Sequence, residues 1–161
     1  MDSLDLISRY KKRIQKSGNQ NELYKWELLK KYRGKPDVEA DDFQAEIASL
    51  NFGNLLYHLS VAVLKDISKY SSQDLREAFR YLFDEKHPLQ QRIDEFKRRT
   101  NSLFEAITPG KSSFQDERSI SVYLAFFDGI NIHCIKVRIM GSFANSSGLK
   151  KRRPEKSTFI I

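Results

Sequence analysis

The chain of 161 residues contains one cysteine, four prolines and seven glycines. The single cysteine, Cys134, excludes an internal disulfide and a cysteine-rich metal site, and it fits a reducing compartment. No apolar run approaches the ~20 residues that a membrane-spanning helix needs. The first residues, MDSLDLISRYKKR, carry acidic groups and lack the apolar segment of a signal peptide. These absences predict a soluble cytoplasmic protein with no membrane partner.

The charge is unbalanced, with 28 basic and 21 acidic residues and a formal net charge of +7. Such a surplus favours polyanionic partners through the long-range field and through counterion release. A solvated surface that ends in a basic tail has the same composition. The charge therefore raises nucleic acid as a partner without establishing it.

Apolar residues recur at three- and four-residue steps through the first 107 residues, which predicts a mainly α-helical body. Ser71 and Asp74 resemble a capping box at the start of one helix, and Pro88 suits the first turn of the next. Trp26 lies three residues before Leu29, and this spacing predicts that its indole is in the core. The six expected helices cover about 4–14, 22–33, 43–50, 54–70, 71–83 and 88–107.

The apolar period then changes to two. Ile120, Val122, Leu124 and Phe126 alternate with their neighbours, which predicts a strand, and Asp128-Gly129 is typical of a hairpin turn. A return strand over about 130–139 would complete a C-terminal β-hairpin, giving a mainly α fold of the α+β type. The predicted organisation is a helical body (1–107), a polar linker (108–118), a β-hairpin (119–140) and a flexible basic tail (141–161).

Gly110-Lys111-Ser112 matches the closing half of a phosphate-binding loop. That motif needs a first glycine five residues before the second, after a strand and ahead of a helix. Glu105 occupies the position of the first glycine, and the expected order here is helix, turn, strand. We therefore expect that the chain neither binds nor hydrolyses a nucleotide.

Other catalytic patterns are weak. Pro36-Asp37 followed by Asp84-x-Lys86 has the composition of a metal-dependent nuclease motif, but that chemistry needs carboxylates that converge from neighbouring strands. The histidines, His58, His87 and His133, share no ligand spacing. The sequence predicts no catalytic residue, metal, cofactor or small-molecule substrate, and so no enzyme.

Basic residues gather in three places: around Trp26 and Tyr32 in the second helix, on the sixth helix away from its apolar stripe, and in the tail. Cations next to aromatic rings suit phosphate contacts and base stacking, whereas exposed lysines and arginines on helices are also common without any ligand. The candidate nucleic-acid contacts are Lys25, Lys30, Lys31 and Arg33 in the second helix, Lys97, Arg98 and Arg99 in the sixth, and Lys150, Lys151, Arg152 and Arg153 in the tail.

Three stretches, ELYKWELLKKYRGKPDVEADDF, LREAFRYLFDEKHPLQQRIDEF and FQDERSISVYLAFF, resemble the region ahead of the motor in McrB-like AAA+ proteins of methylation-dependent restriction systems. The resemblance spans about residues 20–130 in consistent order. Its motifs are Tyr24-Lys25-Trp26-Glu27, Asp41-Asp42-Phe43, Leu82-Phe83-Asp84-Glu85, Gln115-Asp116 and Ile120-Ser121-Val122-Tyr123-Leu124.

The resemblance implies a non-catalytic DNA-recognition or assembly region, with DNA, an AAA+ motor and a McrC-like nuclease subunit as partners. No motor follows in this chain, and the segment after about residue 131 departs from the family's continuation, as in a truncated remnant. A free-standing helical protein-interaction module that never contacts DNA is the alternative function. An unrecognised nuclease is a third.

Overall fold

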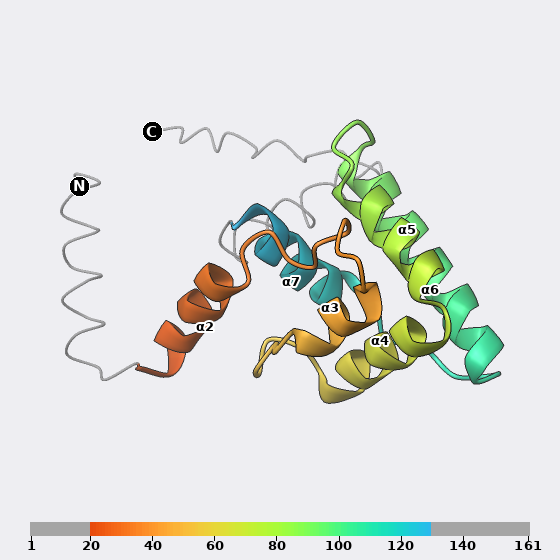
Figure 1. Cartoon of the computed structure of the whole chain (residues 1–161), viewed down its shortest axis with the longest axis horizontal. Coiled ribbons are helices and arrows are strands. Elements are labelled where there is room, and N and C mark those ends of the chain that lie inside the picture. Colours follow the sequence, from red (N-terminus) through yellow and green to blue (C-terminus); the bar gives the residue numbers. More distant parts are fainter. Residues whose placement is uncertain (1–19, 130–161) are drawn as a thin grey trace, which may run out of the picture.

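The computed structural model describes residues 20–129, which form helices joined by short loops (Figure 1). The predicted mainly helical fold is confirmed for this part of the chain. The expected helix at 4–14, the return strand at 130–139 and the tail at 141–161 lie outside the described residues. In chain order the helices are α2 (Gln20–Lys31), α3 (Phe43–Ser49), α4 (His58–Tyr70), α5 (Ser72–Phe83), α6 (Leu89–Ile107) and α7 (Glu117–Asp128).

Helices α5 and α6 pack along each other at one side of the molecule, and α2 lies at the other side (Figure 1). The stripes predicted from the sequence are the buried faces of this pair. Leu82, Ile93 and Phe96 are fully buried. Thr100 is also buried, and its hydroxyl donates a hydrogen bond to the Phe96 carbonyl at 2.8 Å, which satisfies the polar group inside the core.

Side-chain caps begin two of the helices. The carboxylate of Asp42 accepts a hydrogen bond from the Ala45 amide at the start of α3, and Asp116 accepts one from the Ser119 amide at the start of α7, both at 2.9 Å. Each cap satisfies an amide that the helix itself leaves unpaired. Ser71 is the N-cap of α5, but its side chain makes no capping hydrogen bond, so the expected capping box does not form.

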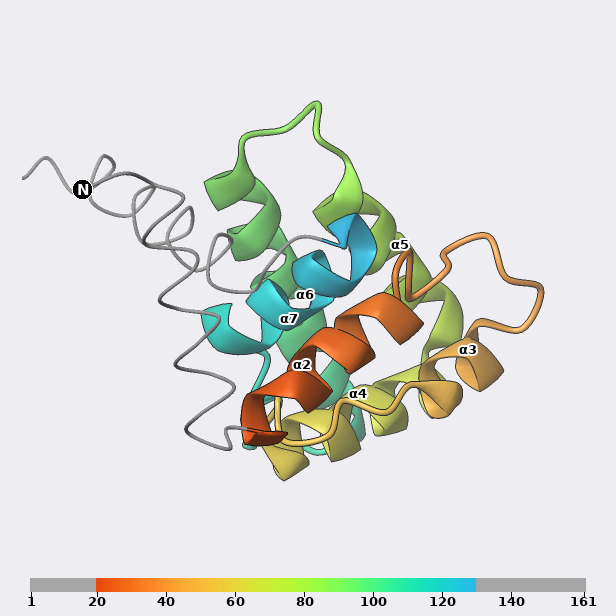
Figure 2. The same cartoon turned by 90° about the vertical axis from the view of Figure 1, so that its left-hand side faces the viewer.

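The predicted strand over 120–127 is wrong, because these residues belong to helix α7. Every residue from 119 to 126 is buried, and α7 runs through the centre of the molecule behind α2 (Figure 2). The ring of Tyr123 lies against Phe52, Phe79 and Phe96, with centroids 5.8, 5.3 and 5.9 Å away. A helix covered on all sides needs no polar face, so its sequence can alternate in apolar character without one clear 3.6-residue stripe. Apolar alternation then imitates a strand.

The dipeptide Asp128-Gly129 ends this helix instead of forming the predicted hairpin turn. Gly129 has φ 64° and ψ 20°, the left-handed conformation that commonly follows the last residue of a helix. A β-carbon added at Gly129 would lie 2.8 Å from Nε of Arg33, so the Arg33 side chain would have to shift to make room for it.

None of the helices within residues 20–129 combines the length and the apolar character needed to cross a membrane.

Candidate nucleic-acid interface

The cations predicted on α6 are already bound to carboxylates. Nζ of Lys97 lies 2.6 Å from Oε1 of Glu117. Arg98 donates two hydrogen bonds to Glu95, at 2.8 and 2.7 Å, and Nε of Arg99 donates a third at 2.7 Å. The two guanidinium groups lower the pKa of Glu95 to about 2. A phosphate at this face would have to compete with these carboxylates, so the structure weakens the case for DNA contact at 97–99.

The cations at the end of α2 are different. Lys30, Lys31 and Arg33 are exposed, and none of them forms an ion pair with a carboxylate of residues 20–129. Nζ of Lys31 lies 5.2 Å above the ring of Tyr32. Lys25 is half-buried in the same helix. The predicted contacts at 150–153 lie outside the described residues.

Trp26 is on the surface of α2, and its predicted place in the core is wrong. Its side chain is 54% exposed. Leu29 and Tyr32 are the residues of this segment that enter the core, and Tyr32 stacks on Phe126 with centroids 5.4 Å apart. Trp26 is one helical turn before Lys30, so the two side chains share a face. We call Trp26, Lys30, Lys31 and Arg33 the α2 surface.

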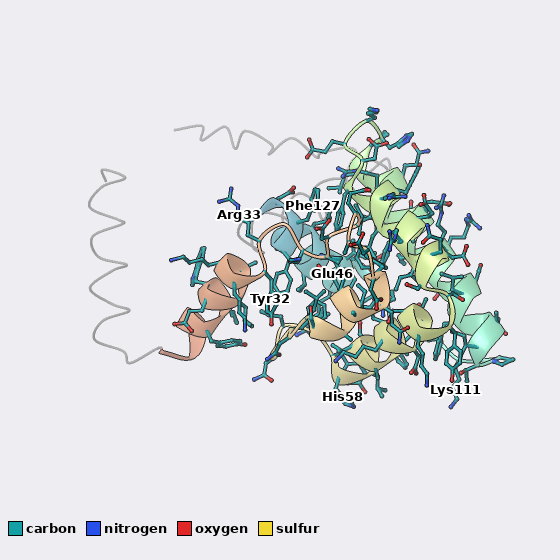
Figure 3. All side chains as sticks on the ribbon, in the orientation of Figure 1. Tyr32, Arg33, Glu46, His58, Lys111 and Phe127 are labelled. Atoms are coloured by element: carbon teal, nitrogen blue, oxygen red, sulfur yellow. The ribbon has the colours of Figure 1, made fainter. Side chains whose placement is uncertain are left out.

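Arg33 has a structural contact as well as an exposed charge. It points away from the core, whereas the adjacent Tyr32 points inward (Figure 3). Its side chain packs over Gly129, and the neighbouring Gly34 amide donates a hydrogen bond to the Phe126 carbonyl at 2.8 Å. The guanidinium therefore lies near the C-terminal end of α7, where a cation stabilises the helix dipole. Lys35 is paired with Glu46 at 3.1 Å, so it differs from Lys30, Lys31 and Arg33, which have no ion pair with a carboxylate of residues 20–129.

An open groove of about 670 Å³ lies on another side of the molecule. It runs between the end of α3, the loop 51–57 and the beginnings of α4 and α7. Leu50, Phe52 and Leu56 are among its apolar lining, and each is at most 7% exposed. Its polar lining includes His58, Lys65 and Arg118, and among residues 20–129 no aspartate or glutamate lines it. We call this the basic groove.

The basic groove is hard to predict from the sequence. Its residues come from three segments of the chain. Its two cations, Lys65 and Arg118, are far apart in the sequence. Cations that are far apart in the sequence can lie on the same surface of the folded protein. One sequence feature that points to the groove is Tyr57-His58, which follows the loop after α3 and stands at the start of α4.

The half-motif at 110–112 makes local contacts. The Glu105 carboxylate accepts hydrogen bonds from the Gly110 amide at 3.0 and 3.1 Å. In a phosphate-binding loop such an amide faces the phosphate. Lys111 is exposed, at the lower right of Figure 3, and the Ser112 hydroxyl accepts a hydrogen bond from the Phe114 amide. The expectation that no nucleotide binds here stays a prediction.

The acidic residues of the nuclease-like pattern stabilise turns. Asp37 accepts a hydrogen bond from the Glu39 amide at 2.9 Å, and Asp84 accepts one from the Lys86 amide at 3.1 Å. Within the described range 20–129, histidines and acidic residues form no group of three or more that could hold a metal ion. His133 lies outside that range.

Many residues that carry the McrB-like resemblance build the fold. Asp42 and Asp116 are helix caps, and Phe43 is buried. Gln115 is 4% exposed and hydrogen-bonds to Ser60 and Tyr123 inside the core. Comparison of the whole chain with family models, curated proteins and solved structures finds no match.

Proposed function

We propose that the chain is a non-catalytic DNA-recognition or assembly region of a McrB-like restriction ATPase, and that it contacts duplex DNA through the α2 surface. The observation that carries this proposal is the exposed Trp26 one helical turn before Lys30, followed by the exposed Lys31 and Arg33. No carboxylate of residues 20–129 forms an ion pair with these three cations. Cations without protein partners are free to bind phosphates, and an exposed aromatic ring supplies flat contact area.

The net charge of +7 and the ordered motifs support the same proposal. Because the motif residues are largely caps and core, the resemblance supports a shared architecture more than a shared chemistry. A motor and a McrC-like nuclease are the partners that such an architecture would serve.

A helical protein-interaction module is the second candidate, and Trp26 favours it too. Tryptophan and arginine are the residues most often found at the energetic centre of protein interfaces. The two functions differ in salt dependence, because a protein interface centred on Trp26 releases few counterions, whereas each phosphate contact with duplex DNA releases about 0.9.

Trp26 is the single tryptophan of the chain, so its fluorescence reports on the α2 surface directly. We would titrate the full chain with a short duplex at several salt concentrations. Lys30→Gln with Lys31→Gln should lower the slope of log K against log salt by about 1.8 if each lysine neutralises one phosphate, since each contact contributes about 0.9.

The matched control is Lys86→Gln with Lys111→Gln. Both lysines are exposed and have no ion pair with a carboxylate of residues 20–129, so the control removes the same charge from loops outside α2. Equal slopes for the two double variants would assign binding to net charge alone. Absence of duplex binding at low salt would move the protein-interaction function to first place.

A further inference from the structure

We propose that the basic groove binds single-stranded nucleic acid. Lys65 projects from α4 and Arg118 from the first turn of α7, and both line the groove. Neither forms an ion pair with a carboxylate of residues 20–129, and none of the aspartates and glutamates in that range lines the groove. The charge complement of this surface is therefore an anion.

Aromatic side chains at the groove specify the kind of anion. Tyr57 lines the groove and is 49% exposed, although it lies beside a well-packed core. Its ring meets His58 with centroids 4.5 Å apart and Phe114 at 5.9 Å, both edge to face. These contacts hold the ring in place while leaving part of it in solvent. Nucleic-acid bases stack on such rings, and the phosphates between them bind nearby cations.

The backbone holds the supporting ring of Phe114 in an unusual conformation. Phe114 has φ 54°, in the left-handed region that bulky residues avoid. Its neighbours Ser113 and Gln115 are buried and hydrogen-bonded, so they maintain this conformation. Strain of this kind is concentrated at functional sites. Phe114 is a positioning residue in this proposal, since it supports Tyr57 and is not part of the groove lining.

The strand form of the ligand follows from the same contacts. In a duplex the faces of the bases are stacked on each other and cannot reach Tyr57, whereas a single strand exposes them. A volume of about 670 Å³ falls within the range typical of small-ligand sites, ~300–1,000 Å³. Because the groove is open, the strand can enter and leave at its ends.

This inference goes beyond the duplex contact proposed for α2. His58, at the groove, and Arg33, on the α2 surface, lie at different edges of the molecule (Figure 3). The two surfaces can therefore be tested separately on one protein.

The test measures fluorescence anisotropy of a labelled oligothymidylate with the full chain, and of a matching oligouridylate to compare DNA with RNA. Tyr57→Ala should weaken binding about tenfold, within the range measured for loss of one base–aromatic stack. Tyr57→Phe keeps the ring and should restore it. Lys65→Gln and Arg118→Gln should each lower the salt slope by about 0.7.

The controls lie on the same helix but outside the groove. Tyr70 is 63% exposed at the end of α4, and Lys69 is one turn after Lys65. Tyr70→Ala and Lys69→Gln should leave oligonucleotide binding unchanged. Polyglutamate tests an acidic peptide as the ligand and should compete poorly, because it offers charge without bases.

The proposal is overturned if Tyr57→Ala binds oligothymidylate as tightly as Tyr57→Phe does, or if polyglutamate competes as well as the oligonucleotide. It is supported if groove variants weaken single-strand binding while the Lys30/Lys31 variant does not. If the unmodified chain binds the single strand but not the duplex, the function proposed for the α2 surface is contradicted, whereas this inference is not.

Discussion

The hydrogen bond between Tyr123 and Gln115 should couple α7 to the loop that precedes it. The Tyr123 hydroxyl donates to Oε1 of Gln115 at 2.6 Å, and both side chains are buried. Burial also raises the pKa of Tyr123 above its usual value, so the phenol remains a donor. Nε2 of Gln115 donates in turn to the carbonyls of Ser60 and Ser113, at 2.9 and 3.0 Å.

Gln115→Met keeps an unbranched side chain of similar length but removes every one of these hydrogen bonds. The Ser60 carbonyl lies in the first turn of α4, where the helix supplies another donor. The Tyr123 hydroxyl and the Ser113 carbonyl would lose their partner. A buried polar group left unsatisfied costs about 1–3 kcal/mol, so we expect Gln115→Met to lower the free energy of unfolding by about 2–4 kcal/mol.

Tyr123→Phe should lower the free energy of unfolding by about 1–2 kcal/mol, because Oε1 of Gln115 then loses its donor. The double variant removes both partners of the bond, which costs much less than leaving one of them unpaired. The combined loss should therefore fall short of the sum of the single losses by about 1 kcal/mol or more. Urea unfolding followed by circular dichroism measures all four proteins.

Gln91→Met provides the control, because Gln91 is exposed on α6 and its replacement should be nearly neutral. Additivity of the two core substitutions within about 0.5 kcal/mol would refute the coupling. A loss below about 1 kcal/mol for Gln115→Met would show that no buried group depends on it.

Trp26→Ala should change stability by no more than about 0.5 kcal/mol in a urea melt, because the indole is exposed; a loss of about 3–5 kcal/mol would place it in the core. Gly129→Ala should cost about 1–2 kcal/mol from its positive φ, and less in an Arg33→Ala background, since the added β-carbon meets Arg33; equal losses in both backgrounds would contradict that contact. The lowered pKa of Glu95 means that its stabilisation, of order 1 kcal/mol, is complete above pH ~4.5 and lost as the pH falls toward 2. The stability difference from Glu95→Gln should shrink over that range, and a constant difference would exclude this linkage.

Some of the ion pairs on α6 can be predicted from residue spacing along the helix, and others cannot. Glu95 precedes Arg98 and Arg99 by three and four positions, which is the spacing of neighbouring residues on a helix surface. These pairs were readable from the sequence once the helix was predicted. The pair between Lys97 and Glu117 was not, since it depends on how α7 approaches α6.

The sequence by itself determined the helices that keep one face in water. In α5 and α6 the apolar stripe alternates with a polar face, so both the helix and much of its buried side follow from a period of 3.6 residues. In α4 the helix follows too, but Leu59 and Tyr70, which were expected on its apolar stripe, are exposed. The sequence also shows that Glu105 breaks the phosphate-loop pattern, because that motif is defined by which residues stand at fixed positions.

Only the tertiary structure decided the form of α7, the exposure of Trp26 and the existence of the basic groove. Residues 119–126 of α7 are all buried, so no polar face marks this segment as a helix in the sequence. For Trp26, the neighbouring Leu29 and Tyr32 fill the available core, and the indole is left outside. The groove joins Tyr57, Lys65 and Arg118, which come together only because the helices that carry them pack around one core.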